Sequence, residues 1–503
     1  MHRRLTVNSI SNVSCYFVSL VVSFSLTPFI LRSLGDSLYG FWVLLLSFIG
    51  YASILEMGVQ PAVVKLVGHY KARGDIPKLR ELLSAALYFF LAAGGLAGLV
   101  LVAVVPPLVT RFVSDLAQVP HLRWLFAVLA ADAIVMFMTY LFAGILYGWQ
   151  MYYAKNLIDI GTWLTNALLL VLFLRPGGIL TLAAIKLATD LVALSAIVSV
   201  CRRVFPELRL QRGAVHQGSF RELLGFGSRI FVSATTSRLA THAQPMIISS
   251  GLSAAATAFY SFPARLVDFG RQITWGLTTG FMPLFSELHS LEERALLESV
   301  YLRYSRYVLL AMLPILVLLF AFGPPFIGLW LGPEHGPAYA ERGRVVLYLL
   351  AAASLVESLQ PLLWRFFIGV GHLDFLVKVS AATSGLVILT GIVLVQPLGI
   401  AGVAVGVLLG AVLAQVVFAH HTCRFLHLSL PAFIRRVHLQ PLLAGGIGLG
   451  VALGIARAIG TGSLLALAAG ATSTCLAYVA IVWLLALRPE ERRWVAARIR
   501  RRP

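Results

Sequence analysis

The sequence predicts an all-α polytopic membrane protein of about 14 transmembrane helices, arranged as two six-helix lobes around a central cavity plus two C-terminal helices. Three observations predict this fold class: an apolar composition, a one-sided distribution of basic loops and an internal repeat. Hydrophobic residues make up 59% of the 503 residues and charged residues only 12%, with a mean hydropathy of +0.87. A membrane-crossing helix needs about 20 mainly apolar residues. Fourteen segments meet this requirement: 8–32, 38–62, 83–105, 123–147, 156–174, 179–200, 229–250, 257–286, 304–322, 344–368, 376–395, 399–421, 441–459 and 464–487.

The basic residues predict how these spans are oriented. Lys and Arg total 40 against 21 Asp and Glu, which gives a net charge of +19. With the N-terminus in the cytoplasm, the inner loops hold 28 of the 40, the outer loops seven and the spans five. The positive-inside rule therefore predicts a multi-pass protein with both termini in the cytoplasm. We attribute the excess positive charge to loops that stay in the cytoplasm and contact anionic membrane lipids, and not to a nucleic-acid surface.

Self-comparison of the chain indicates a duplicated six-helix unit. The pair Pro106-Pro107 recurs as Pro324-Pro325, and the segment 175–179 recurs at nearly the same offset as 396–400. Three further matches lie at closely similar offsets: Cys201 with Cys423, Pro28 with Pro245, and Pro61 with Pro283. Because six is even, both copies enter the membrane in the same direction, as in a parallel repeat.

The repeat and the loops together predict six parts of the chain. These are an N-lobe at 1–201, a cytoplasmic linker at 202–228, a C-lobe at 229–423, a cytoplasmic loop at 424–440, two added helices at 441–487 and a basic cytoplasmic tail at 488–503.

The candidate binding site is the hairpin of spans seven and eight, because these spans carry charges that lipid would not tolerate. Arg238 lies near the middle of span seven, and Arg265, Asp268 and Arg271 follow at three-residue spacing in span eight. An ionised group at mid-bilayer costs at least about 2.5–3.5 kcal/mol, so these side chains should face a protein interior or a water-filled cavity. The alternative is that Asp268 simply neutralises Arg265 or Arg271 as a packing contact.

Two other carboxylates inside spans are candidates for coupling to H+ or Na+. Glu56 lies in span two with no basic residue at helical spacing on its own segment, and Asp132 lies in span four. A carboxyl group in such surroundings is suited to binding a proton or sodium ion. For Glu56, pairing with an Arg across the cavity is an equally good interpretation. Lys186 and Asp190, four residues apart, are expected to form a buried pair.

Four prolines inside spans are candidate gate residues. Pro28, Pro61, Pro245 and Pro283 bend spans one, two, seven and eight, which head the two predicted lobes. Ordinary kinks of membrane helices would also explain any one of them, but their paired placement favours gates.

No constellation for catalysis, metal binding or disulfide formation is found. The four cysteines show no CxxC spacing, the twelve histidines form no HExxH motif, and there is no GxxxxGK[ST] loop. The outer loops are too short for the domain that a membrane glycosyltransferase or polymerase would need. Transport therefore fits better than catalysis, with no cofactor and no metal.

Several segments resemble a known family of transporters. They are TPFILRSLGD at 27–36, LYG at 38–40, LEMGVQPA at 55–62, KARGD at 71–75 and PLGIAGVA at 397–404. This wording resembles the polysaccharide-transporter (Wzx-type) branch of the multidrug/oligosaccharidyl-lipid/polysaccharide exporter superfamily. The resemblance implies two six-helix lobes around a cationic cavity, whose charge Arg238, Arg265 and Arg271 would supply. The matching span of the first lobe is apolar apart from Ser47 and Tyr51, so we expect positive charge on one lobe only.

The function expected from these features is translocation of an undecaprenyl-pyrophosphate-linked oligosaccharide from the inner to the outer leaflet of the bacterial plasma membrane by alternating access. Other polysaccharide-assembly proteins are expected partners. The alternative is an ion-coupled multidrug-type exporter of small molecules, which would want an acidic or aromatic cavity for cationic drugs.

The topology can be tested with reporter fusions. A reporter joined after Arg457 is expected to lie outside the cell and one joined after Arg488 inside, because basic loops stay in the cytoplasm. Paired enzymatic reporters that are active on opposite sides of the membrane measure this directly. The reverse pattern at the two positions would show that the orientation is wrong.

Overall fold

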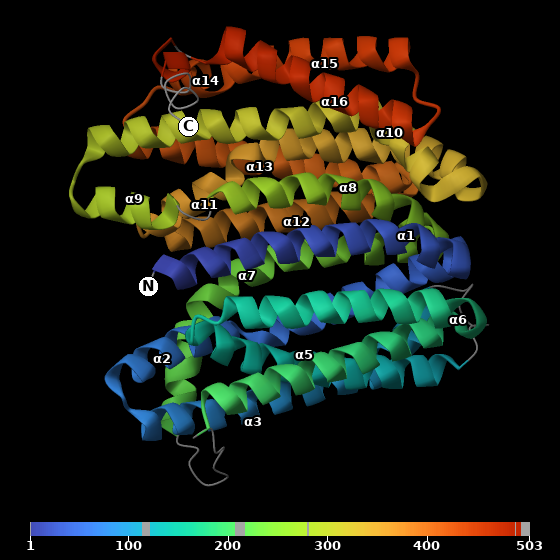
Figure 1. The fold of residues 1–503 in the computed structure, drawn as a ribbon, viewed down its shortest axis with the longest axis vertical. Coiled ribbons are helices and arrows are strands. Elements are labelled where there is room, and N and C mark those ends of the chain that lie inside the picture. Colours follow the sequence, from blue (N-terminus) through green and yellow to red (C-terminus); the bar gives the residue numbers. More distant parts are fainter. Residues whose placement is uncertain (1, 113–120, 207–216, 279–280, 488, 494–503) are drawn as a thin grey trace. The chain divides into compact units, whose positions relative to one another are not determined.

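A computed structural model describes residues 2–112, 121–206, 217–278, 281–487 and 489–493. Within these ranges every regular element is helical (Figure 1). The chain divides into two compact units, Met1–Ala258 and Phe259–Pro503. Each unit is described by itself.

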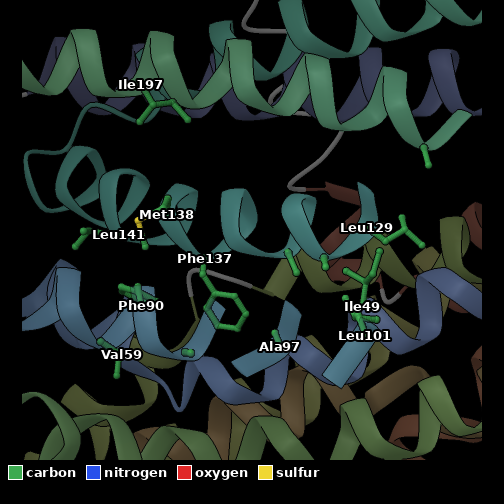
Figure 2. Packing of buried hydrophobic residues seen from close by; sticks show 14 of the residues in the cluster. Ile49, Val59, Phe90, Ala97, Leu101, Leu129, Phe137, Met138, Leu141 and Ile197 are labelled. Carbon is green, nitrogen blue, oxygen red and sulfur yellow. The ribbon is translucent and has the colours of Figure 1, made fainter. Parts of the chain in front are cut away.

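The first unit is built from seven α-helices and the start of an eighth. They are α1 (His2–Ala52), α2 (Val59–Arg73), α3 (Ile76–Ala103), α4 (Val105–Phe112), α5 (Leu122–Gly148), α6 (Tyr152–Val204) and α7 (Gln217–Gly251), with the short 3-10 helix η1 (Ser53–Glu56) between α1 and α2. Helix α5 packs between α3 and α6, and α6 packs against α1. Figure 2 shows the core that results, in which the rings of Phe90 on α3 and Phe137 on α5 lie 6.3 Å apart. Small residues, such as Gly98 opposite Ala130, let these helices approach closely.

The second unit contains the remaining helices. They are α8 (Ala254–Thr278), α9 (Phe281–Ser290), α10 (Arg294–Val356), η3 (Glu357–Leu359), α11 (Gln360–Gly369), α12 (Leu373–Leu398), α13 (Ile400–Phe425), α14 (Leu430–Ile434), η4 (Arg435–Leu439), α15 (Gln440–Ile459), α16 (Leu464–Ile481) and η5 (Val482–Ala486). Helices α12 and α13 form a hairpin, and α10 packs against both α13 and α15. Helix α16 completes a second hairpin with α15.

The helices account for the predicted number of spans. Among the described residues, ten helices are long and apolar enough to cross a membrane. Two of them, Ser14–Glu56 and Arg294–Gly369, are each long enough for two spans and are broken by a glycine with positive φ, Gly35 at 76° and Gly332 at 83°. The charged helices α7 and α8, which are not among the ten, bring the total to fourteen. The all-α polytopic fold class is confirmed.

The internal repeat is visible in how helices end. Gly74 and Glu292 are equivalent positions of the repeat and have φ of 71° and 58°, and the equivalent positions Gln150 and Gly371 have φ of 58° and 85°. All four turns contain the same pair of backbone hydrogen bonds; at Gly74, for example, its N–H donates to the Lys71 carbonyl while the Asp75 N–H donates to that of Tyr70. This is the Schellman arrangement, which satisfies carbonyls at a helix end. The same turns therefore recur at the offsets that the sequence comparison found.

The repeated segments 175–179 and 396–400 also form the same turn. Gly178 and Gly399 have φ, ψ of 64°, −155° and 61°, −145°, a conformation that only glycine adopts without strain. Each glycine therefore lets the chain reverse between two long helices. The orientation of the two copies relative to each other stays a prediction.

Helix α7 begins inside the predicted linker 202–228 and continues into the predicted C-lobe, but it belongs to the first compact unit. It packs against α1, α2 and α3. Tyr70 donates a 2.8 Å hydrogen bond to Glu222, and Ser219 donates one to Glu81. The bond to Glu222 raises the pKa of Tyr70 to about 12, because ionisation would remove the donated proton. The boundaries of the two six-helix lobes at 202–228 stay a prediction.

The close approach of α12 and α13 can be tested at Gly402. An added Cβ there would lie 2.1 Å from the Leu394 carbonyl oxygen, whereas at Gly385 on α12 a Cβ would meet nothing within 4 Å. We expect Gly402→Ala to lower the free energy of unfolding by about 1–3 kcal/mol, because the backbone must move to make room for the added Cβ. The control Gly385→Ala should be neutral or stabilising by up to about 1 kcal/mol. Unfolding midpoints in one detergent measure both, and equal midpoints would contradict the close contact.

Candidate functional site

The charged residues of α8 lie beside a cavity in the second unit. Helix α8 begins at a cap, where Ser253 Oγ accepts a 3.1 Å hydrogen bond from the Ala256 N–H. Four to five turns further on, Asp268 and Arg271 line a cavity of about 260 Å³. The remaining lining residues come from α8, α10, η3 and α11: Gln272, Thr274, Trp275, Met312, Ser354, Glu357, Ser358, Gln360 and Pro361. The cavity is polar and lies where a proline-bearing helix begins.

Arg271 is held by two carboxylates. Its Nη1 lies 3.7 Å from Asp268 Oδ1, and its Nη2 contacts Glu357 Oε2. The side chains of Arg271 and Asp268 are 34% and 56% exposed, whereas that of Glu357 is 16% exposed. Asp268 therefore does pair with Arg271, as the alternative interpretation allowed. It shares the guanidinium with a residue from another helix that the sequence analysis did not place at the site.

Glu357 had a signal in the sequence that could have found it. It is the first residue of η3 and lies four residues before Pro361, in the sequence ESLQP. Glu56 ends η1 and stands five residues before Pro61, in the wording EMGVQP. In both places a carboxylate lies at a 3-10 turn that breaks a long helix, and a Gln-Pro pair lies within the first three residues of the next helix. Glutamate followed by Gln-Pro within an apolar segment therefore marks a helix break with an ionisable group.

A second cation lies close to this cavity. The Arg365 guanidinium on α11 lies 5.7 Å from the centre of the Trp275 ring, which lines the cavity. Its Nε is buried and has no hydrogen-bond partner among the described residues. Arg365 is one of the five basic residues within the predicted spans, but no sequence pattern relates it to the hairpin. A cation over an indole ring keeps its charge and its donors for a ligand.

The other predicted cations are placed differently. Arg265 is half-buried on α8 and interacts electrostatically with Asp268, but it does not line the cavity. Arg238 lies on α7, and its side chain is outside the described residues.

The predicted gate prolines also differ in their positions. Pro28 and Pro245 lie inside α1 and α7, as expected for kinks. Pro61 is the third residue of α2, and Pro283 is the third residue of α9, with its side chain outside the described residues. The last two thus lie at helix beginnings, where proline is tolerated. The gate role of all four stays a prediction.

Asp132 belongs to an ion-pair triad in the first unit. Lys186 Nζ lies 2.6 Å from Asp132 Oδ2 and 2.7 Å from Asp190 Oδ2. The expected pair of Lys186 and Asp190 is therefore present, but it is not buried, because the two side chains are 28% and 34% exposed. The Asp132 side chain is only 1% exposed, and its Oδ1 has no hydrogen-bond partner among the described residues. Pairing with Lys186 favours a packing role for Asp132, while the open Oδ1 leaves room for a proton.

Glu56 is buried, with 6% of its surface exposed, at the break between η1 and α2. Its role in ion coupling stays a prediction. Among the described residues, no group of three or more His, Cys, Asp and Glu side chains could hold a metal ion.

Comparison with known proteins relates the chain to polysaccharide biosynthesis. Residues 30–339, more than half of the chain, match the model of a family described as "Polysaccharide biosynthesis protein". The membrane protein EpsK of Bacillus subtilis (strain 168), described as uncharacterized, is 23% identical over 524 residues, which cover 99% of this chain and 98% of EpsK.

The fold is similar to those of two solved transporters. The lipid II flippase MurJ in an inward closed conformation has a TM-score of 0.67 at 13% identity, covering 95% of this chain and 98% of its own. An inward-facing multidrug resistance transporter of the MATE family, from the MOP superfamily, has a TM-score of 0.67 at 15% identity, covering 86% of this chain and 98% of its own. The chain is a multi-pass membrane protein with the fold of these transporters.

The triad can be tested by removing its lysine. Lys186→Met should destabilise the protein by about 3 kcal/mol, because the buried Asp132 carboxylate loses its counter-charge. The double variant Lys186→Met, Asp132→Asn should recover most of that loss, since the buried charge is gone. Unfolding midpoints of detergent-purified protein measure both variants. A Lys186→Met protein as stable as the wild type would show that the triad contributes nothing to packing.

Proposed function

Because the chain belongs to the polysaccharide biosynthesis protein family, we propose that it is a flippase for an undecaprenyl-pyrophosphate-linked oligosaccharide. It carries this substrate from the inner to the outer leaflet of the bacterial plasma membrane by alternating access. Family and fold are those of a transporter or flippase, as the resemblance to the Wzx-type branch implied. The pyrophosphate-linked substrate, the inner membrane and the cytoplasmic termini are parts of the proposal.

The pairing of Arg271 with two carboxylates, whose place a phosphate group can take, supports a pyrophosphate substrate. A pyrophosphate presents several charged oxygens, and a guanidinium can engage two of them at once. Asp268 and Glu357 hold Arg271 in position. An incoming pyrophosphate takes the place of these carboxylates. The exchange needs little reorganisation of Arg271 itself.

Arg365 and Arg271 supply the positive charge of the site. These two cations at the cavity are balanced by Asp268 and Glu357. A dianionic head group is attracted by the surplus positive charge that forms once either carboxylate swings away. Trp275 adds an aromatic surface on which a sugar ring can stack.

A second candidate function is ion-coupled export of cationic small molecules, and Glu357 is the observation that favours it. A carboxylate beside Trp275 in one cavity is the combination that cationic drugs prefer. In that case Arg271 would be the group that a proton or drug displaces from Glu357. A flippase would need Arg271 to bind its substrate, whereas a drug exporter would need Glu357. Substitutions of Arg271 and Glu357 therefore distinguish the two functions.

Substitution of Arg271 tests the leading proposal. Arg271→Ala should reduce flipping about 10- to 100-fold, because charged hydrogen bonds of about 1.5–3 kcal/mol to the head group are lost. Arg271→Lys should rescue partly, since it keeps the charge but loses the planar fork. Asp268→Asn should hold Arg271 less firmly in its orientation, and it should reduce flipping less than Arg271→Ala does. The measurement is accumulation of lipid-linked sugar in the inner leaflet, normalised to the amount of inserted protein.

Arg344→Ala serves as the matched control, because Arg344 is exposed on α10 and does not line the cavity. Normal flipping by the double variant Arg265→Ala, Arg271→Ala would show that these charges are structural pairs. Glu357→Gln separates the two functions, since it should weaken export of a cationic drug but leave binding of a pyrophosphate lipid intact or tighter.

A further inference from the structure

A second polar cavity lies in the second unit, away from the residues that line the Arg271 cavity. Its volume is about 430 Å³, and it lies where the beginning of α10, the η4 turn and the segment 489–493 meet. It is lined by Ala295, Glu298, Ser299, Leu302, Arg303, Arg306, Arg436 and Glu491. Three of the eight side chains are arginines. The charge distribution of the sequence predicts that all three segments face the cytoplasm.

Arg306 is the buried centre of this cavity. Its side chain is 3% exposed, and its Nη2 donates a hydrogen bond to Glu491 Oε1. Its Nε and Nη1 are buried and have no hydrogen-bond partner among the described residues. A buried guanidinium with two unsatisfied nitrogens is unusual, because buried polar groups are nearly always hydrogen-bonded. In the described part of the chain, two donors of Arg306 therefore lack an acceptor.

The other two arginines add charge without closing the cavity. Arg303, one turn before Arg306 on α10, is exposed and makes no ion pair among the described residues. Arg436 in η4 lies 3.3 Å from Glu298. With Arg306 paired to Glu491, the lining carries three positive charges and two negative charges. The excess charge belongs to Arg303, which lines the same cavity as Arg306.

The segment after α16 is fixed as one wall. Glu491 accepts a second hydrogen bond, of 2.6 Å, from the Tyr307 hydroxyl. Arg492 donates hydrogen bonds of 2.7 Å and 3.1 Å to the carbonyls of Leu484 and Leu487. These contacts hold the start of the tail against α10 and the end of η5.

We propose that this cavity binds a phosphate group, carried either by an anionic lipid or by a soluble phosphate ester. A phosphate has enough oxygens to accept from Arg306 Nε, Arg306 Nη1 and Arg303 together, which a single carboxylate cannot do. Arginine suits such multidentate contacts better than lysine because its donors are fixed in one plane. Basic residues at the cytoplasmic surface also lie at the level of anionic lipid head groups.

Binding to purified full-length protein in a neutral detergent tests the proposal. The probes are dioleoylphosphatidylglycerol, dioleoylglycerol with the same chains but no phosphate, and glycerol 1-phosphate with the phosphate but no chains. Native mass spectrometry counts bound lipid, and the rise in the unfolding midpoint reports all three probes. We expect phosphatidylglycerol to bind and dioleoylglycerol not to.

Binding of glycerol 1-phosphate as tight as that of phosphatidylglycerol would identify a site for a soluble phosphate ester, and clearly weaker binding would identify a lipid site. Both results support a phosphate site. Equal binding of phosphatidylglycerol and dioleoylglycerol, or no binding of any probe, would overturn it.

Two variants assign the binding to this cavity. Arg303→Gln should weaken phosphate binding about tenfold while leaving the fold intact, because Arg303 is exposed and unpaired in the described structure. Glu491→Gln should tighten binding, since it removes the negative charge beside Arg306. Arg457→Gln, an exposed arginine on α15, is the control and should change nothing. Unchanged binding by both Arg303→Gln and Glu491→Gln would overturn the assignment.

This inference is independent of the proposed flippase function. The Arg271→Ala variant should bind phosphatidylglycerol like the wild type, whatever its effect on flipping.

Discussion

The structure depends on one constraint: a charge among apolar helices needs a partner, which is most often a counter-charge. Lys186 meets this constraint with Asp132 and Asp190, Arg271 with Asp268 and Glu357, and Arg306 with Glu491. In the first two cases one cation lies between two carboxylates, one on its own helix and one from another part of the chain. Such shared pairs join helices that apolar packing alone would leave free to slide, since lipid offers no hydrophobic gain for helix association.

The same constraint governs where helices break. Within hydrocarbon, every backbone group needs a partner, so a break is tolerated only where side chains or water can supply one. The structure breaks its long helices at glycines with positive φ, such as Gly178 and Gly399, and at the two 3-10 turns that carry Glu56 and Glu357. The glycine breaks reverse the chain, whereas the glutamate breaks place a carboxylate at a bend. The glutamate breaks are therefore the better candidates for functional sites.

Much of the fold was predictable because it depends on patterns local to the chain. Apolar length predicted the fourteen spans, and the segments 175–179 and 396–400 predicted the paired glycine turns. The site was less predictable, because ion pairing joins residues far apart in sequence, as Arg271 with Glu357 and Asp132 with Lys186. Helical spacing within one span found Asp268 for Arg271 and Asp190 for Lys186. Spacing within one span cannot predict the partner that each of these cations has on another helix.

The exposure of these pairs separates structural charges from those available to a ligand. Asp132 is 1% exposed beside Lys186, so replacing its partner would leave a carboxylate with no access to water. Asp268 is 56% exposed beside Arg271, so water can take the place of either partner at little cost. A transporter must bind and release its substrate in each cycle, which requires contacts that exchange easily. Arg271, paired with the exposed Asp268 on the wall of a polar cavity, meets this requirement, and Lys186, paired with the buried Asp132, does not.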